Sequence, residues 1–262
     1  MRILPLLLVT SVACAPPVDA PSDFESLCAF IFEHAEDEEP EAMQDGVVNL
    51  QSWLDINREK IGEGYVVKSL DEGFVERFEE QAWDLTNLVG VAYATQYEYT
   101  MDQILETIIK DDENEPRYDE EGRLTYRRTF NSDRECFLER RCDTLQYEIE
   151  TIDSFAMNIE ATMHYVANIV RFETEWGTAV VWRNWQLKPI AFNWDWIRFD
   201  LSYYLGVLVE IEPGLVERTE ATWVLGEFAN APLPMDVALS MGVDTLIEST
   251  EELRDELAEA YP

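Results

Sequence analysis

Side chains that commonly carry out enzyme chemistry are few in this sequence. Only two of its 262 residues are histidines, His34 and His164, and neither has a serine or cysteine partner at a recognisable spacing. The nucleophile elbow, the phosphate-binding loop, the metalloprotease helix motif and the dinucleotide fingerprint do not occur. Asp and Glu number 54, so a carboxylate pair at a hydrolase spacing is expected by chance alone. We therefore expect no enzyme, no metal site and no cofactor.

Aromatic residues are the one concentrated feature with a chemical use. Between positions 176 and 223 the sequence holds six tryptophans and a Tyr-Tyr pair. Trp and Tyr combine a large apolar area with one polar tip, which suits the wall of a ligand pocket. The alternative is ordinary core packing. We predict that a hydrophobic ligand would contact Tyr165, Trp185, Trp194, Tyr203, Trp223 and Leu246.

The four cysteines divide into three kinds. Cys136 and Cys142 are close in sequence and, in a secreted chain, predict a disulfide closing a small loop. Cys28 lies in an apolar helical segment and is expected to be a buried, free thiol, although its spacing leaves pairing with either of the other two open. Cys14 directly follows the N-terminal segment 1–13, which resembles a signal peptide.

The first 13 residues have the features of a cleaved signal peptide. A positive charge at Arg2 precedes an apolar run at 3–9 that is too short to span a bilayer. The following Ser11-Val12-Ala13-Cys14 resembles a bacterial lipobox, although Ser11 stands where the pattern usually has Leu. The resemblance implies lipidation of Cys14 and, with no Asp after it, retention at the outer membrane, on the periplasmic or the surface face. A plain secretory signal is the alternative. Residues 14–23 would form a proline-stiffened tether.

The balance of acidic and basic residues limits the kinds of partner that the protein can bind. Nineteen basic residues face 54 acidic ones, giving a net charge of −35, while 47% of the chain is hydrophobic. The chain can therefore fill a core, with the acid spread over its surface. Such a surface disfavours nucleic acid and anionic lipid head groups. It is typical of salt-adapted secreted proteins, and a cationic partner is the alternative explanation.

The elements that must position a site begin with one long helix at 234–260. Its apolar residues recur at the spacing of a single buried stripe; they are Met235, Leu239, Val243, Leu246, Leu253 and Leu257. Its opposite face is acidic. A helix of this kind must bury its stripe on a neighbour, and strands precede it. We therefore expect the helix to pack on a sheet, with Leu239, Leu246 and Leu253 in the core.

Seven segments before that helix have strand composition. They are residues 88–99, 124–130, 144–151, 158–172, 178–187, 198–210 and 215–226. The clearest alternation places Phe199, Tyr203 and Leu205 on a buried face and Ser202 on a wet face, as in an antiparallel sheet with one solvated side. Met163 and Tyr165 share the apolar side of an earlier strand. Residues 24–84 predict a helical segment that begins with a capping box at Ser22 and Glu25.

This order of elements resembles the START-like, or SRPBCC, helix-grip architecture over residues 85–262. The resemblance implies an α+β fold in which a seven-stranded curved antiparallel sheet grips the C-terminal helix and leaves a cavity between them. Lipocalin-like barrels with a final helix would give a similar pattern. The chain is also similar to a group of bacterial outer-membrane lipoproteins, for which no activity is implied. The shared features are Phe32-Glu33-His34, a Cys-Phe-Leu…Cys loop at 136–142 and Trp182-Arg183-Asn184-Trp185.

Two functions follow from these expectations. The first is a lipid-anchored protein that binds a lipid or other hydrophobic molecule in the cavity. The second is a structural or interaction lipoprotein whose core is filled by its own Trp and Tyr side chains. A cavity of several hundred Å³ between helix and sheet would favour the first.

Overall fold

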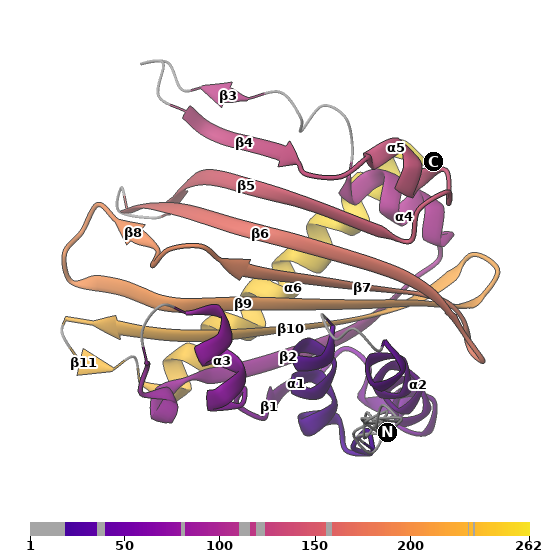
Figure 1. Ribbon diagram of the computed structural model, residues 1–262, viewed down its shortest axis with the longest axis horizontal. Helices are drawn as coiled ribbons and strands as arrows, with labels where there is room; N and C mark the ends of the chain where they lie inside the picture. The colour runs from indigo at the N-terminus through magenta and orange to yellow at the C-terminus, as the bar shows by residue number, and fades with distance from the viewer. Residues whose placement is uncertain are drawn as a thin grey trace, which may run out of the picture.

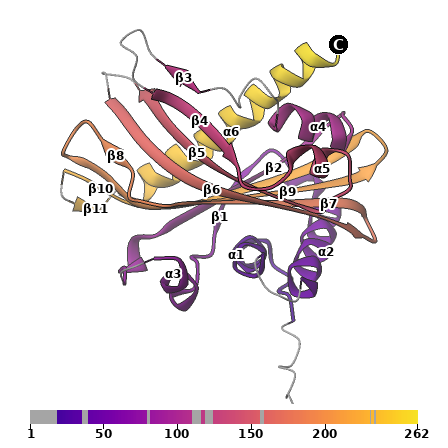
Figure 2. The same cartoon turned by 45° about the horizontal axis from the view of Figure 1, so that its top comes forward.

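In the part of the chain that the computed structural model describes, an antiparallel sheet of eleven strands forms the centre of the molecule. The structure describes residues 19–35, 40–79, 82–109, 116–118, 124–155, 159–229, 231–232 and 234–262. The predicted signal peptide (1–13) and Cys14 lie outside these residues, as does the first half of the predicted tether, 14–18. Figures 1 and 2 show a helical layer on one face of the sheet and a single long helix across the other.

The strands follow the order β1-β2-β10-β9-β7-β6-β5-β4-β3 across the sheet, with β8 paired to β6 and β11 paired to β10. Neighbouring strands along the chain form hairpins from β4 to β7, whereas β2 inserts between β1 and β10. The bounds are β1 Gly64–Val67, β2 Val89–Tyr97, β3 Arg117–Tyr118, β4 Leu124–Phe130, β5 Thr144–Phe155, β6 Ile159–Thr174, β7 Gly177–Gln186, β8 Ala191–Phe192, β9 Ile197–Glu212, β10 Leu215–Phe228 and β11 Ala231–Pro232.

The predicted α+β class is confirmed, and all seven predicted strands are present close to their expected bounds. The sheet is larger than predicted because four short strands, β1, β3, β8 and β11, extend it. These strands have two to four residues, too few to show a periodic hydrophobic pattern.

Helices cover both faces of the sheet, which corrects the expectation of one solvated face. The N-terminal layer consists of α1 Phe24–His34, α2 Glu41–Ile56 and α3 Glu72–Phe78, with short 3-10 turns at Arg58–Lys60 and Leu85–Asn87. Tyr203 and Leu205 of β9 face this layer and belong to its core. Tyr204 and Leu208, on the opposite face, pack in the cores beneath the C-terminal helix.

The first helix starts one residue later than the predicted capping box allows. Asp23 is the N-cap of α1, and its carboxylate accepts a hydrogen bond from the backbone N–H of Ser26. The expected box with Ser22 and Glu25 is therefore wrong. Asp is as effective an N-cap as Ser, and its position one residue further on satisfies a free N–H of the first turn.

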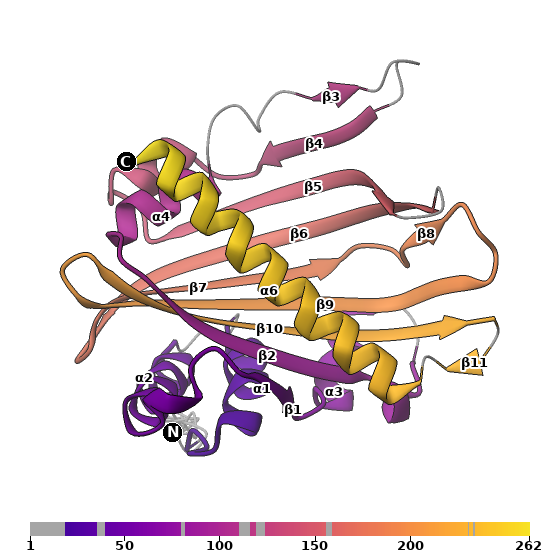
Figure 3. The ribbon, with the colours of Figure 1, turned by 180° about the vertical axis from the view of Figure 1, so that it is seen from behind.

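The C-terminal helix, α6 Met235–Ala260, crosses the sheet diagonally (Figure 3). It is tightly held from Leu246 onward: Leu246, Leu253 and Leu257 are buried, as predicted. The part before Leu246 is not. Met235 and Met241 are about half exposed (48% and 50%), and Leu239 and Val243 are only partly buried. The expectation that Leu239 is a core residue is corrected accordingly.

The remaining helices close one end of the sheet. They are α4 Met101–Ile108, which begins with a capping box between Thr100 and Gln103, and α5 Arg134–Leu138. The predicted disulfide between Cys136 and Cys142 is present and ties α5 to the start of β5, with 5.3 Å between the two Cα atoms. Cys28 is free and buried in α1, as expected.

Candidate functional site

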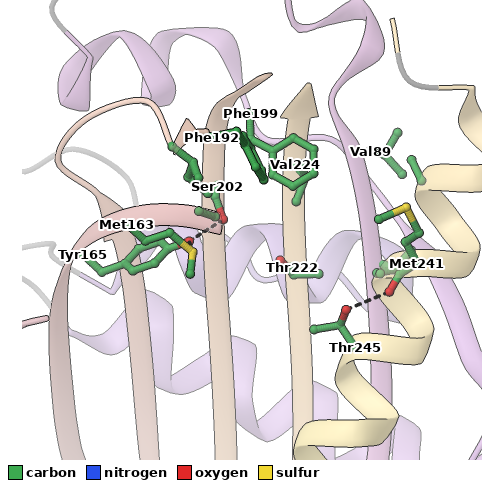
Figure 4. A pocket seen from close by; sticks show the side chains of 15 residues that line it. Val89, Met163, Tyr165, Phe192, Phe199, Ser202, Thr222, Val224, Met241 and Thr245 are labelled. Atoms are coloured by element: carbon green, nitrogen blue, oxygen red, sulfur yellow. Dashed lines mark hydrogen bonds between the residues drawn. The ribbon is translucent and has the colours of Figure 1, made fainter. Parts of the chain in front are cut away.

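A pocket of about 300 Å³ lies between the first half of α6 and the sheet. Strands β2, β6, β9 and β10 and the short β8 form its floor and one end, and Ala238, Met241, Gly242 and Thr245 of α6 form its far wall. Figure 4 shows Tyr165 and Ser202 on one side and Met241 and Thr245 on the other. The pocket is partly open to solvent.

The pocket lies where the strand pairing of the sheet becomes irregular. Strand β7 ends at Gln186, and beyond it β8 pairs with β6 through Phe192 and Ala161. The pairing of β9 with β10 also steps by one residue, from Leu201 opposite Leu225 to Phe199 opposite Gly226. A β-bulge of this kind re-aims a side chain, and here it brings Phe199 into the pocket.

Two glycines allow this packing. A Cβ at Gly226 would lie 2.5 Å from a ring carbon of Phe199, so any larger residue would displace the ring that closes the end of the pocket. A Cβ at Gly242 would lie 2.6 Å from a methyl group of Val91. The absence of a side chain there lets α6 contact β2 directly beside the pocket.

The wall is apolar with a few hydroxyl groups, and none of its described lining residues is charged. Two hydroxyls donate to backbone carbonyls: Thr222 on β10 to the carbonyl of Tyr203 on β9 at 3.0 Å, and Thr245 to that of Met241 one turn earlier in α6 at 2.9 Å. The Tyr165 hydroxyl lies 3.3 Å from Ser202 Oγ. The wall thus offers hydrophobic contact and a single cross-strand hydroxyl pair.

Of the six residues predicted to contact a ligand, only Tyr165 lines this pocket. Trp185, Tyr203 and Trp223 are placed on the opposite face of the sheet, in the core under the N-terminal helices. There the ring of Phe32 lies 5.6 Å from Tyr203 and 5.4 Å from Trp223. The physical reason is the two-residue period of a strand, which fixes side chains on alternate faces, combined with an N-terminal layer that also needed an apolar partner.

The other two predicted residues lie near the pocket but outside its wall. Leu246 is buried against Val89 and Val91, which do line it. Trp194 packs on Trp196 at 4.9 Å, in an aromatic cluster at the β8 end of the sheet.

Sequence reasoning missed most of the residues that do line the pocket. Ser202 was expected on a solvated face, and Phe199 on the face of Tyr203. The bulge reverses the alternation between these positions, and the sequence carries no signal for it. The apolar side of β6, with Met163 and Tyr165 sharing one face, was recognisable from its alternation and is the face that lines the pocket.

A buried polar cluster fixes the second half of α6 beside the pocket. Arg218 on β10 pairs with Glu220 at 2.6 Å and donates to the Tyr204 and Tyr97 hydroxyls. Glu220 in turn accepts from the hydroxyl of Thr250 on α6 at 3.1 Å.

Electrostatics keep this cluster in one protonation state. Burial opposes the charge of Arg218, but the adjacent Glu220 carboxylate raises its pKa overall. Burial likewise raises the pKa of Tyr204 well above its usual value. The arginine is therefore charged and the phenol neutral at any physiological pH. A buried pair of this kind is more often a means of fixing one arrangement than a source of net stability.

The described residues contain no group of three or more His, Cys, Asp and Glu side chains placed to hold a metal ion. None of the helices in the described ranges combines the length and apolar character needed to span a bilayer.

Comparisons with known proteins give similarity of structure alone. No protein-family model and no curated protein matches the chain. A STAR-related lipid transfer protein from Xanthomonas axonopodis is similar at 12% identity and a TM-score of 0.44, covering 74% of this chain and 92% of that one. The human StarD13 (DLC2) lipid transfer and protein localization domain is similar at 11% identity and a TM-score of 0.39, covering 81% and 96%. A START superfamily protein from Mycobacterium smegmatis is similar at 9% identity and a TM-score of 0.36, covering 65% and 98%.

Proposed function

We propose that this protein binds a hydrophobic small molecule in the pocket between α6 and the sheet. The observation that carries the proposal is the pocket itself: about 300 Å³, apolar, uncharged and partly open. Small-molecule sites are typically concave and mostly apolar, and roughly 300–1,000 Å³ in volume. We assign the pocket no catalytic role, because its described wall offers hydroxyls without a carboxylate or imidazole beside them.

The volume limits the ligand. If each non-hydrogen atom takes up roughly 20–30 Å³, comparable to a water molecule in the liquid, a pocket of about 300 Å³ holds ten to fifteen such atoms. That corresponds to one short alkyl chain or a small ring system. Burying about ten methylene groups contributes roughly 8 kcal/mol, of which association cancels at least ~4 kcal/mol. The net is at most ~4 kcal/mol, so we expect a dissociation constant of about a millimolar or weaker.

We further propose that the protein is anchored to the outer membrane through a lipidated Cys14. The motif at 11–14 supports this, and the geometry is compatible with it. Asn49 of α2 donates to the backbone carbonyls of Ala20 and Pro21, at 3.2 and 2.9 Å. The start of the described chain is thus held on the N-terminal helical layer, on the face of the sheet away from the pocket.

The competing function is a structural or interaction lipoprotein without a ligand. One observation favours it: Trp185, Tyr203 and Trp223, the core of the aromatic block, fill the opposite face of the sheet. Native mass spectrometry of protein purified from its own envelope distinguishes the two. A retained small molecule supports binding, and its absence together with failure to bind an apolar fluorescent probe supports the structural function.

A pocket-filling variant shows where a probe binds. Ala238→Trp places a large ring in the pocket wall and should reduce probe affinity at least tenfold. Ala258→Trp, on an exposed part of the same helix, is the matched control and should bind as the unaltered protein does. Equal binding by both variants would place the probe elsewhere and contradict the proposal.

Fractionation tests the anchor. Cys14→Ala should move the protein from the membrane fraction to the soluble fraction, because stable anchoring needs the buried acyl chains. Retention of the variant in the membrane would show that the assignment of Cys14 is wrong.

A further inference from the structure

Three polar side chains form a row on the sheet face that carries the pocket; Tyr165 and Ser202 line the pocket, and Gln186 lies between their strands without lining it. Tyr165 on β6 is paired with Gln186 on β7. The β7–β9 pairing runs through Trp185 opposite Tyr203, so the next residues in register are Gln186 and Ser202. Residues paired across antiparallel strands share one face of the sheet. Tyr165, Gln186 and Ser202 therefore lie side by side on the face that α6 crosses.

The middle member of this row is buried with an unused acceptor. Gln186 is only 4% exposed. Its Nε2 donates to the backbone carbonyl of Asp200, whereas its Oε1 has no hydrogen-bond partner among the residues that the structure describes. The Tyr165 hydroxyl spans the row and lies 3.3 Å from Ser202 Oγ, as Figure 4 shows. A buried acceptor without a donor is destabilising and calls for an explanation.

The charge around the row restricts what could supply the missing donor. No described lining residue of the pocket is charged, and the nearest buried acid in sequence, Asp200, is paired with Arg198 at 2.7 Å. An anionic head group would lose its hydration here without a counter-charge. The chain's net charge of −35 also repels anions at a distance. A neutral donor has neither penalty.

We propose that the row Tyr165–Gln186–Ser202 recognises a neutral, hydroxyl-bearing hydrophobic molecule, such as a medium-chain alcohol, and discriminates against the corresponding carboxylate. The ligand hydroxyl separates the Tyr165 and Ser202 hydroxyls at the pocket wall, accepts a hydrogen bond from one of them and donates to Gln186 Oε1, which lies enclosed between their strands. Its hydrocarbon part occupies the apolar remainder of the pocket. This inference rests on the proposed function, since it names the class of ligand that the same pocket takes.

The test is displacement of an apolar fluorescent probe from the purified protein by three compounds of equal chain length. Decanol can donate and accept, decyl methyl ether can only accept, and decanoate is anionic at neutral pH. We expect decanol to bind about three- to tenfold more tightly than the ether, as one neutral hydrogen bond allows, and decanoate to bind most weakly.

Variants locate the effect. Gln186→Leu should abolish the preference for decanol over the ether. Binding of the ether to this variant should stay within about twofold, which shows an intact pocket. Tyr165→Phe and Ser202→Ala each remove a donor that both compounds use, so both compounds should bind more weakly to these variants. Matched controls remove the same groups elsewhere: Tyr261→Phe, whose hydroxyl donates to Glu106, and Ser240→Ala on the exposed side of α6. Both should keep the preference.

The outcomes separate the two levels of the proposal. Equal binding of decanol and the ether, or a preference for decanoate, overturns hydroxyl recognition but leaves the hydrophobic pocket standing. A preference for decanol that survives in Gln186→Leu overturns the assigned residues. If none of the three compounds displaces the probe, the binding function itself fails, and hydroxyl recognition fails with it.

Discussion

The part of α6 before Leu246 and the part from Leu246 onward should respond differently to the same substitution. Leu246 is 2% exposed and packs against Val89 and Val91. Leu239, two turns earlier, is only partly buried, beside the pocket. Leu246→Ala removes fully buried methyl groups and leaves a cavity, which costs about 2–5 kcal/mol of unfolding free energy. Leu239→Ala removes groups that solvent already reaches, so we expect a cost of about 1 kcal/mol, near the average for all point substitutions and below the range for a buried leucine.

Urea denaturation followed by tryptophan fluorescence measures both values. The slope of the unfolding free energy with urea should be unchanged, so that the midpoint reports stability. Glu251→Ala, on the exposed face of the same helix, is the control and should lie within about ±0.5 kcal/mol of the unaltered protein. Equal losses for Leu239→Ala and Leu246→Ala would mean that the helix is held along its whole length. A harmless Leu246→Ala would mean that it is not held at all. Either result would refute the packing described here.

Three further predictions concern buried polar groups. Glu220→Ala leaves the charge of Arg218 buried without its partner and should cost about 3–5 kcal/mol in the same urea assay. Burial raises the pKa of Glu79, and the hydrogen bond from Tyr203 offsets part of this rise. Protonated Glu79 therefore contributes to the free energy of unfolding below the unfolded-state pKa. This contribution is lost as the pH rises through the folded-state pKa. Glu79→Gln should accordingly raise stability at neutral pH and change nothing in acid, and a gain in acid alone would contradict this sign. Burial raises the pKa of Cys28 to about 12, so a thiol reagent should modify it only after unfolding, and rapid labelling of the native protein would show that it is accessible.

Long elements were predictable from the sequence because each repeats its pattern several times. The strand at 144–151 is observed at Thr144–Phe155, and the one at 198–210 at Ile197–Glu212. The C-terminal helix was predicted over 234–260 and spans Met235–Ala260. In these segments the period of the hydrophobic residues reflects burial directly. The observed bounds therefore differ from the predicted ones only at the ends of each element.

The site was less predictable because both faces of the sheet are covered. A strand with one wet face shows which side is the core, but β9 buries Tyr203 on one face and Leu208 on the other. The alternation of apolar residues along such a strand then shows which side chains share a face. It does not show which helices pack against that face. Tyr203 and Trp223 were predicted to lie on the face of the sheet that the C-terminal helix covers. They lie on the other face, where Phe32 of α1 packs against both rings. The bulge at Asp200, which moves Phe199 into the pocket, depends on pairing between distant strands and leaves no local mark.

The position of the pocket follows from how α6 is held. Its second half is fixed by Leu253 and Leu257 and by the contact of Thr250 with the buried Glu220. Its first half has no such anchor, and Met241 is half exposed at the pocket wall. Regions with few buried apolar contacts open at a lower free energy than the core. A helix locked at one end can therefore leave apolar space under the other end without loss of the fold. Burial of Leu253 and Leu257 supplies stability that an unfilled pocket does not. The loosely packed part of the helix is the part that a ligand would stabilise.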